Sequence, residues 1–397
     1  MEACRIVHRD PPIWKAHQST ASNISLSRAK RPKRVVVLSS GPPISLKVLY
    51  CLHKLDIEAD VIDLLRTSIA KYSRYRRQYA QFRLDGADDE GAQLSRQLGA
   101  YILQNGIDAV VGVDVFASGM LHAVRDRIPQ VILFPVSSAA TLEMLDDKWQ
   151  FQQFMVENQI PCPRSILLRS VQELSSMKSL GLAFPVVVKP LRGESGHGIV
   201  HADSIAGIRR HLESGSMYAR LPLLIQEFAS GYDADLSILA RAGTVASHVL
   251  HSRLGGCSLR FIKNDAVLDI GKRIARAANY TGVANIDVRI DETTGRVCVL
   301  ECNPRFWYTL QASLWRGLNF VEAGLALAQG DSEPREAPVG GTYHLHGCLL
   351  KKILWNPANW RDVSLYNVKG LLQALTDPLP FIHDRLARRI PAPAAPN

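Results

Sequence analysis

The chain has 397 residues, of which 47% are hydrophobic and 21% are charged, and its formal net charge is +10 at pH 7. This composition excludes a disordered or fibrous protein and is typical of a globular chain with two or three domains. Polar residues interrupt every apolar run before it reaches the roughly 18–20 residues of a membrane-spanning helix. The beginning of the chain also lacks the apolar stretch of a secretory signal. We therefore expect a soluble, cytoplasmic protein without membrane contact.

The cysteines favour the same compartment. All seven are scattered along the chain, and no two of them form a CxxC pair. An odd number without paired spacing argues against a disulfide framework and against a zinc site, and it suits a reducing cytoplasm.

Positive charge is concentrated in the segments 1–34, 71–83 and 385–389. Such patches attract anions of any kind, including nucleotides and acidic metabolites. They lack the interleaved aromatic residues of a nucleic-acid-binding motif, so nucleic acid is not expected as a partner. Residues 1–33 show no sustained apolar period and are expected to form a flexible basic extension.

Ordered structure is predicted to start at Arg34. The apolar, β-branched run 34–38 ends at Ser39-Ser40-Gly41, which indicates a buried strand and its turn. A helix near 44–55, a strand near 59–64, and continuously apolar strands at 109–113 and 130–134 complete a parallel α/β domain over residues 34–140. No GxGxxG follows the first strand, which argues against dinucleotide binding.

A region of α+β character is expected from residue 141. Apolar residues at near-helical spacing from Leu142 to Met155 predict a helix, which Asn158 and the prolines after it end. Strands and helices alternate over 165–240, longer strands follow over 246–304, and a helical region covers 310–329. The expected parts are a small subdomain (141–225), a large subdomain (226–330), a C-terminal helical extension (331–390) and a disordered tail (391–397).

The segment Phe184–Ile199, FPVVVKPLRGESGHGI, joins a strand to a glycine-rich loop. The strand delivers Lys189, and Gly193, Gly196 and Gly198 follow it immediately. Glycines let backbone N–H groups turn towards a phosphate, and a lysine supplies a point charge. Because the lysine precedes the glycines and no GKS or GKT occurs, this is not a Walker loop. An ordinary hairpin rich in turn residues is the alternative.

The predicted strand 297–303, VCVLECN, carries oxygen ligands at a spacing of two. Because side chains alternate between the faces of a strand, Glu301 and Asn303 share one face. The opposite face, which we expect to be buried in the core, carries Cys298, Leu300 and Cys302. A carboxylate and an amide oxygen at this spacing suit a magnesium site.

A second predicted strand, 285–290, places Asn285, Asp287 and Arg289 on one face and three apolar residues on the other. The linker 291–295 is suited to a hairpin turn. Pairing of the two strands would bring Asp287 beside Glu301, and two carboxylates side by side repel unless a cation lies between them. The alternative is a solvated strand face.

These segments together resemble the ATP-grasp superfamily over residues 141–330. The resemblance rests on the lysine strand with its glycine-rich loop, the hinge Gln226-Glu227-Phe228, and the D…ExN strands, in that order. It implies two α+β subdomains that close on ATP, preceded by an α/β domain such as 34–140. It also implies Mg²⁺ as the metal, with Mn²⁺ as an alternative. Within the superfamily, the chain looks most like a poorly characterised branch of predicted carboligases related to carbamoyl-phosphate synthetase and biotin carboxylase.

The resemblance also implies roles for single residues that touch ATP. It assigns Lys148 and Lys189 to the phosphates, together with the glycines of the loop. The residues assigned to the adenine edge are Gln226, Glu227 and Phe228, with the backbone through Ala229. Asp233 lies where the family has a ribose-binding glutamate, and Asp235 on the same strand face is the substitute.

The metal ligands implied by the resemblance are Asp287, Glu301 and Asn303. Arg305 matches a basic residue near the transferred group, and Arg260 is a candidate for the γ-phosphate. The other candidate substrate contacts are Asn285 and Arg289, which share the strand face of Asp287. Three aromatic residues either wall the acceptor pocket or pack in the core, with packing favoured: Trp307, Tyr308 and Trp315.

Most members of this superfamily transfer the γ-phosphoryl group to a carboxylate, and an amine or a thiol then attacks the acyl-phosphate. The resemblance therefore implies a ligase that acts on a small-molecule acid and an acceptor and releases ADP and phosphate. A phosphotransferase on the same scaffold and a nucleotide-binding regulator without turnover are the alternatives. A homodimer is left open, and the sequence names neither the acid nor the acceptor.

Overall fold

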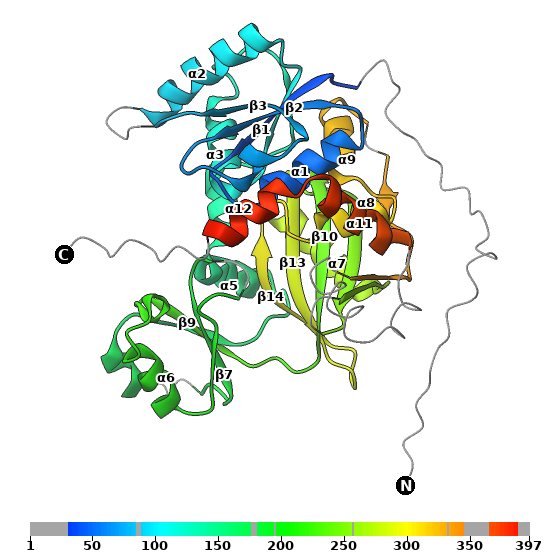
Figure 1. The fold of residues 1–397 in the computed structure, drawn as a ribbon. Coiled ribbons are helices and arrows are strands. Elements are labelled where there is room, and N and C mark those ends of the chain that lie inside the picture. The colour runs from blue at the N-terminus through cyan, green and yellow to red at the C-terminus, as the bar shows by residue number, and fades with distance from the viewer. Residues whose placement is uncertain are drawn as a thin grey trace. The chain divides into compact units, whose positions relative to one another are not determined.

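The computed structural model describes residues 31–84, 89–175, 181–193, 196–255, 258–331, 333–344 and 365–387. By internal contacts the chain divides into Met1–Arg31 and Pro32–Asn397, and the second unit is described here (Figure 1). The expected basic extension, apart from residues 31–33, and the expected tail at 391–397 lie outside the described residues.

A parallel five-stranded sheet in the order β3-β2-β1-β4-β5 forms the first part of this unit, and the sequence predicts four of its strands and their parallel direction. Its elements are β1 (Arg34–Ser39), α1 (Ile44–His53), β2 (Glu58–Asp63), β3 (Arg76–Gln81), α2 (Glu90–Asn105), β4 (Ala109–Gly112), α3 (Val115–Val124) and β5 (Ile132–Leu133). Val36 and Leu38 of β1 are fully buried in one cluster with residues of α2 and α3. The continuously apolar run of β1 is thus explained by helices that pack against the sheet.

The sequence does not predict β3, because this edge strand is polar and only partly buried. Its Arg77 donates to the buried carboxylate of Asp60, with Nε 2.9 Å from Oδ1, and the backbone N–H of Gln78 donates to the same oxygen. Part of the basic segment 71–83 is therefore an ordered strand, and the charge of its Arg77 is compensated within the sheet.

A four-stranded antiparallel sheet in the order β6-β9-β7-β8 holds the lysine strand. Its elements are β6 (Ser165–Leu168), β7 (Val186–Pro190), β8 (Val200–Ala202), α6 (Ile205–Leu212) and β9 (Leu223–Glu227). Val186 and Val188 of β7 pack with Ile225 of β9 and Ile208 of α6 in a small separate core. The boundaries of the small and large subdomains stay predictions.

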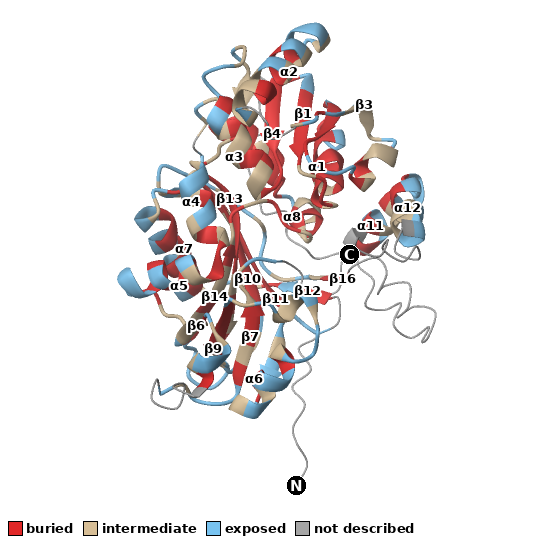
Figure 2. Cartoon of the chain, turned by 90° about the vertical axis from the view of Figure 1, so that its left-hand side faces the viewer, coloured by how far each residue is buried: buried red, intermediate tan, exposed pale blue. Residues whose placement is uncertain are grey.

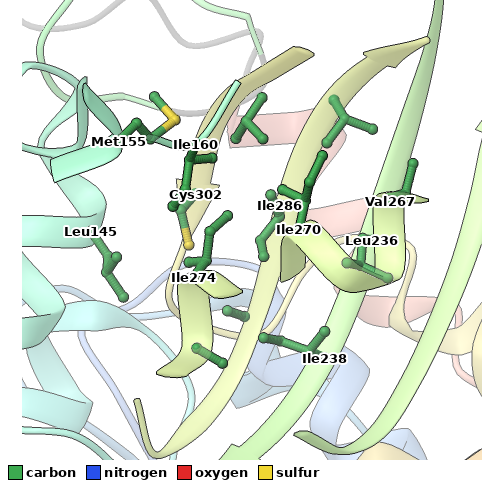
Figure 3. Packing of buried hydrophobic residues seen from close by; sticks show 14 of the residues in the cluster. Leu145, Met155, Ile160, Leu236, Ile238, Val267, Ile270, Ile274, Ile286 and Cys302 are labelled. Atoms are coloured by element: carbon green, nitrogen blue, oxygen red, sulfur yellow. The ribbon is translucent and has the colours of Figure 1, made fainter. Parts of the chain in front are cut away.

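The third sheet carries the metal-type strands in the order β14-β13-β10-β11-β12-β16, and β15 pairs with β11. Its strands are β10 (Tyr232–Arg241), β11 (Thr244–Arg253), β12 (Ser258–Phe261), β13 (Gly282–Ile290), β14 (Val297–Asn303), β15 (Arg335–Glu336) and β16 (Thr342–His344). The helix α7 (Asp265–Ala277) follows β12, and its Val267, Ile270 and Ile274 join Leu236 and Ile286 in one apolar cluster (Figure 3). One face of this sheet is therefore committed to this core, and its strands are largely buried (Figure 2), while polar residues such as Asp235, Asn285 and Asp287 point to the other face.

The single helix expected from Leu142 to Met155 is in fact two helices, α4 (Ala139–Asp146) and α5 (Lys148–Glu157). Asp147 separates them because its backbone is extended and its carboxylate accepts hydrogen bonds from the N–H groups of Trp149 and Gln150. This is an N-cap, which starts a new helix at Lys148. The region 310–329 is divided in the same way into α8 (Leu310–Trp315) and α9 (Phe320–Ala328), with Asn319 as the N-cap of α9.

The segment 331–390, expected to be helical, also contains β15 and β16, which extend the third sheet. Its described helices are α11 (Leu365–Thr376) and α12 (Leu379–Ala387). Asp377 between them is buried and accepts hydrogen bonds from Ser73 Oγ at 2.6 Å and from the N–H of Arg74 at 2.9 Å. The C-terminal helices are therefore tied to the parallel-sheet region. No helix among the described residues is both long and apolar enough to cross a membrane.

Candidate functional site: a polar cavity between two antiparallel sheets

A cavity of about 570 Å³ lies against the polar face of β10, β13 and β14, and residues of β7 and β9 also line it. Most of the predicted site residues line it: Lys189, Gly196, Gln226, Glu227, Phe228, Ala229, Asp233, Asn285, Asp287, Arg289, Glu301, Asn303 and Arg305. Segments up to about 120 residues apart in the chain thus contribute to one site. Lys148, Gly193, Gly198 and Arg260 are not among its lining residues.

Strand register places the polar side chains in rows across the sheet. Asp235 of β10 lies opposite Asp287 of β13, which lies opposite Glu301 of β14. In the next row Ser237, Asn285 and Asn303 are partners in the same way. The predicted pairing of Asp287 with Glu301 is therefore confirmed.

The predicted core face of β14 is wrong in part. The register shifts after Asp287, so that Val288 lies opposite Val299 and Leu300 is the extra residue of a bulge. Val299 and Cys302 are consequently buried in the core, whereas Leu300 lines the cavity and Cys298 lies opposite Arg289.

Asp287 lies among carboxylates. Burial and the neighbouring charges of Asp235 and Glu301 raise its pKa well above the ordinary value, and Arg253 opposes the shift from 3.5 Å. Asn285 is buried and donates from Nδ2 to Asp287 Oδ1 at 2.8 Å, while its own Oδ1 accepts from Ser237 Oγ. Asn285, predicted as a substrate contact, therefore orients Asp287.

Glu301 lies beside two lysines. Burial would raise its pKa, but the charges of Lys148 and Lys189 outweigh burial and lower it. Lys148 Nζ lies 3.4 Å from Glu301 Oε2, and it also donates to the carbonyl oxygen of Gly193 at 3.3 Å. Lys148, the first residue of α5, is thereby brought to the metal-type strand and to the glycine-rich loop.

Lys189 is 3% exposed, and burial lowers its pKa to about 8, an effect that the charge of Glu301 opposes. A buried ammonium at this position is costly unless anions face it. The charge of Lys189 is therefore only partly compensated by the described residues. A lysine that binds a phosphate would have this property.

The glycines of the loop have backbone conformations that favour glycine, with φ +139° at Gly193, +73° at Gly196 and +78° at Gly198. A Cβ atom on Gly198 would lie 2.6 Å from Tyr218 Cβ, which explains why only glycine fits there. The hairpin alternative and the phosphate loop both need this geometry, so the loop alone does not decide between them.

The predicted hinge lies along the edge of the cavity. Gln226 is buried and donates to Ser165 Oγ at 3.1 Å, and Glu227 accepts from the N–H of Ala183 at 2.9 Å. These side chains position the hinge, and the backbone beyond them lines the cavity.

Arg289 holds the segment that follows the hinge. Its Nη1 donates to the carbonyl oxygen of Ala229 at 2.8 Å, and its Nε lies 3.1 Å from Asp233 Oδ1. Its guanidinium carbon lies 4.8 Å from the centre of the Phe228 ring. Arg289, predicted as a substrate contact, and Asp233, predicted as the ribose ligand, therefore pair with one another.

Arg305 is held at the end of β14, where Nη2 donates to Asn303 Oδ1 at 3.1 Å and Nη1 donates to the carbonyl oxygen of Phe306. The cavity is continued past it by Trp307 and Tyr308, whereas Trp315 at the end of α8 does not line it. Two of the three aromatic residues thus reach the site as well as packing.

Sequence reasoning missed Arg253, the last residue of β11. It donates to Asp235 through Nε at 2.8 Å and Nη2 at 2.6 Å, and it reaches Asp287 at 3.5 Å. Burial alone would raise the pKa of Asp235, but His251 and Arg253 hold it well below the ordinary value. Asp235, named only as a ribose substitute, therefore anchors Arg253. The candidate Arg260 is exposed instead.

The donor set fits a hard divalent cation. Among the described residues no three His, Cys, Asp or Glu side chains gather as a metal site, and the predicted set here is two carboxylates and an amide oxygen. Asp287, Glu301 and Asn303 offer oxygen atoms alone, which is the preference of Mg²⁺. The raised pKa of Asp287 reports a repulsion that a cation would relieve.

The fold and the cavity define a class: a parallel α/β sheet followed by two antiparallel sheets, with lysines facing carboxylates in the cavity between the last two. Comparison with known proteins places this class. The model of the RimK-like ATP-grasp domain matches residues 145–250, and that of the ATP-grasp in the biosynthetic pathway with Ter operon matches residues 220–345. The chain belongs to the ATP-grasp superfamily.

Individual relatives are distant. The large chain of carbamoyl phosphate synthase from Acidobacterium capsulatum is 25% identical over 186 residues, which are 43% of this chain and 17% of that protein. The chain thus matches about a sixth of the length of this curated relative.

Two solved structures share the fold along most of their length. N5-carboxyaminoimidazole synthetase from Staphylococcus aureus, complexed with ADP, has 12% identity and a TM-score of 0.62, covering 81% of this chain and 86% of that one. L-amino acid ligase from Bacillus licheniformis has 14% identity and a TM-score of 0.54, covering 77% and 78%.

Proposed function

We propose that this protein is an ATP- and Mg²⁺-dependent ligase that activates a small-molecule carboxylate as an acyl-phosphate. The observation that carries the proposal is the convergence of Lys148 and Lys189 on Glu301, which lines the cavity with Lys189 and the second carboxylate, Asp287. Cations and carboxylates in this arrangement suit a polyphosphate and its metal. The names of the relatives, a synthase, a synthetase and a ligase, support the reaction class.

In the proposed first step, an oxygen of the substrate carboxylate attacks the γ-phosphorus of ATP. The bond from that phosphorus to the β–γ bridging oxygen breaks, and ADP leaves. In the second step an amine attacks the acyl carbon, inorganic phosphate leaves with the electron pair of the C–O bond, and the nitrogen loses a proton. No side chain of the protein becomes covalently modified in this sequence.

The protein contributes position and charge. Lys148 and Lys189 would stabilise the negative charge that develops on the transferred phosphoryl group. Arg305 and Arg253 add two guanidinium groups at the cavity, each held by a neighbouring side chain. Asp287, Glu301 and Asn303 would hold Mg²⁺, which neutralises phosphate charge when bound.

The hinge and its neighbours would bind the nucleoside. Backbone groups from Gln226 to Ala229 lie along the cavity, and the ring of Phe228 is 40% exposed there. Because Asp233 is paired with Arg289, Asp235 is anchored to Arg253, and both are shorter than glutamate, we propose that ribose is bound without a dedicated carboxylate ligand.

The test is product analysis with Mg-ATP and a panel of carboxylic acids and amines, with hydroxylamine in place of the amine in parallel. ADP, phosphate and a hydroxamate are expected, because hydroxylamine traps an acyl-phosphate. A stable phosphorylated product would indicate a phosphotransferase, and ATP binding without turnover would indicate a regulator. AMP and pyrophosphate would contradict the mechanism.

A matched pair of variants links the activity to the cavity. Glu301→Gln removes one charge at the proposed metal site, and Glu292→Gln makes the same change at an exposed turn. The first is expected to abolish hydroxamate formation and the second to leave it unchanged. Equal activity in both would separate the chemistry from this cavity.

A further inference from the structure

A second cavity, of about 990 Å³, lies apart from the one already described. Its lining residues come from the end of α1, the beginnings of β2 and β3, the end of α8 and one side of α11. None of them lines the first cavity. Its position at the amino ends of β2 and β3 also separates it from the carboxyl ends of the parallel strands, where α/β sheets bind ligands.

The charged lining of this second cavity is mainly basic. The charged residues are Lys54, Asp56, Glu58, Arg74, Arg76, Arg77 and Lys369. Glu58 is paired with Arg34 at 3.0 Å, and Arg77 is paired with Asp60. Among these lining residues, four cations are left after these pairs, and one carboxylate without a pair. The cations are Lys54, Arg74, Arg76 and Lys369, and the carboxylate is Asp56.

Two of those four cations donate only to neutral acceptors. Arg74 Nη1 donates to the carbonyl oxygen of Thr376 at 3.2 Å, and Arg76 Nε donates to that of Lys71. These hydrogen bonds fix the side chains without cancelling their charge. A cleft lined by one sign of charge concentrates ions of the opposite sign, so this cavity favours an anion.

Aromatic rings stand beside the cations. The Tyr50 and Trp315 rings meet edge to face with centroids 5.3 Å apart, and His53 stacks on Tyr75 at 4.3 Å. Lys54 Nζ lies 5.2 Å from the centroid of Tyr50 and 5.7 Å from that of Trp315. Lys369 Nζ approaches the same Trp315 ring, at 6.0 Å from its centroid.

Tyr50 is buried, so the rings that can offer a flat apolar surface to a ligand are those of His53, Tyr75 and Trp315, while the ammonium groups beside Trp315 are available to an anionic substituent. Lys54 and Lys369 reach the cavity from two different elements, α1 and α11. A ligand with both a planar ring and an anionic group would contact all of these features at once.

We propose that this second cavity binds a small molecule that combines a planar ring with a phosphate or carboxylate group. The site is separate from the nucleotide cavity and does not depend on the reaction proposed above. Its volume is in the range of small-molecule sites, roughly 300–1,000 Å³.

The proposal is tested by calorimetric titration of the full-length protein with phenyl phosphate, which carries a ring and an anion without a nucleoside. Inorganic phosphate and phenol are the comparison ligands, since each lacks one of the two features. Phenyl phosphate is expected to bind at least tenfold more tightly than either. Equal binding of phosphate and phenyl phosphate, or no binding of phenyl phosphate, would overturn the proposal.

Variants locate the bound probe. The double variant Lys54→Gln/Lys369→Gln, at two exposed side chains, is expected to weaken phenyl phosphate at least tenfold. Lys263→Gln, an exposed lysine elsewhere, is the matched control and should leave binding unchanged. Lys189→Ala should also leave it unchanged. If Lys189→Ala abolishes binding and the double variant does not, the probe occupies the nucleotide cavity and the proposal is wrong.

Discussion

The two facing carboxylates of the candidate metal site should respond in opposite ways to neutralisation. Glu301 is held in its charged form by Lys148 and Lys189, so its pKa is lowered. Asp287 is buried and flanked by Asp235 and Glu301, so its pKa is raised. Glu301→Gln should therefore destabilise the metal-free protein, whereas Asp287→Asn should leave its stability unchanged or increase it.

The size of the change in the free energy of unfolding follows from how deeply Lys148 and Glu301 are buried. Removing one partner of a fully buried ion pair costs about 3–5 kcal/mol, because the other charge stays buried and unpaired. Lys148 is 9% exposed, but the Glu301 side chain is 19% exposed and faces an open cavity, so water screens part of the loss. We expect a loss of about 1–2 kcal/mol for Glu301→Gln and a gain of up to about 1 kcal/mol for Asp287→Asn.

The assay is urea denaturation at pH 7, with and without Mg-ATP. A ligand at one hundred times its Kd stabilises the folded state by about 2.7 kcal/mol. The wild type should show such a gain, and both variants should lose most of it, because each lacks one proposed metal ligand. Lower stability of the metal-free Asp287→Asn than of Glu301→Gln would refute the charge reasoning. A full Mg-ATP gain in both variants would refute the metal assignment.

Three further changes test other parts of the structure. Lys189→Ala should weaken ATP roughly tenfold or more by calorimetry, the worth of a charge-assisted contact, in a protein that stays folded. Asp377→Ala should cost about 1–3 kcal/mol in urea denaturation and expose the C-terminal helices to limited proteolysis, since it leaves buried donors unpaired. Gly324→Ala should cost about 1–3 kcal/mol, because a Cβ atom there would overlap the Phe134 ring, whereas Gly119→Ala, whose Cβ would lie 3.7 Å from its nearest neighbour, should not destabilise.

The parts of the fold that the sequence predicts correctly are those in which a short stretch of residues determines the structure. The run at 34–38 is apolar on both faces, and only a strand covered on both sides explains such a run. The pairing of β13 with β14 follows from two alternating strands joined by the short turn 291–295, which fixes the register at the hairpin end. The hairpin-end register alone would place Asp287 opposite Leu300, so the sequence predicts that Asp287 and Glu301 are neighbours, and the bulge at Leu300 makes them direct partners.

The mistaken elements depend on contacts that the local pattern does not contain. The break between α4 and α5 rests on the cap formed by Asp147, in a stretch whose apolar spacing stays helical throughout. The bulge at Leu300 changes the phase of β14 without a glycine or proline to mark it. β3 is stabilised by Arg77 and the buried Asp60 on the neighbouring strand, a long-range pairing that its own six residues do not show.

The sequence predicts Arg260 as a basic residue at the site, whereas the structure places Arg253 there. This difference also depends on contacts between strands. Residues paired across two antiparallel strands lie on the same face, and in β11 and β12 the pairs are Arg253 with Leu259 and Ser252 with Arg260. Shifting this register by one residue would turn Arg260 towards the cavity. The register between β11 and β12 is set by the length and the conformation of the turn that joins them, and glycine residues in a turn permit several conformations. Arg253 itself is held at the cavity by Asp235, which lies opposite His251 and receives two hydrogen bonds from Arg253. The placement of a basic residue at the site thus depends on a carboxylate of the neighbouring strand. The sequence of the loop after residue 253 does not reveal that contact.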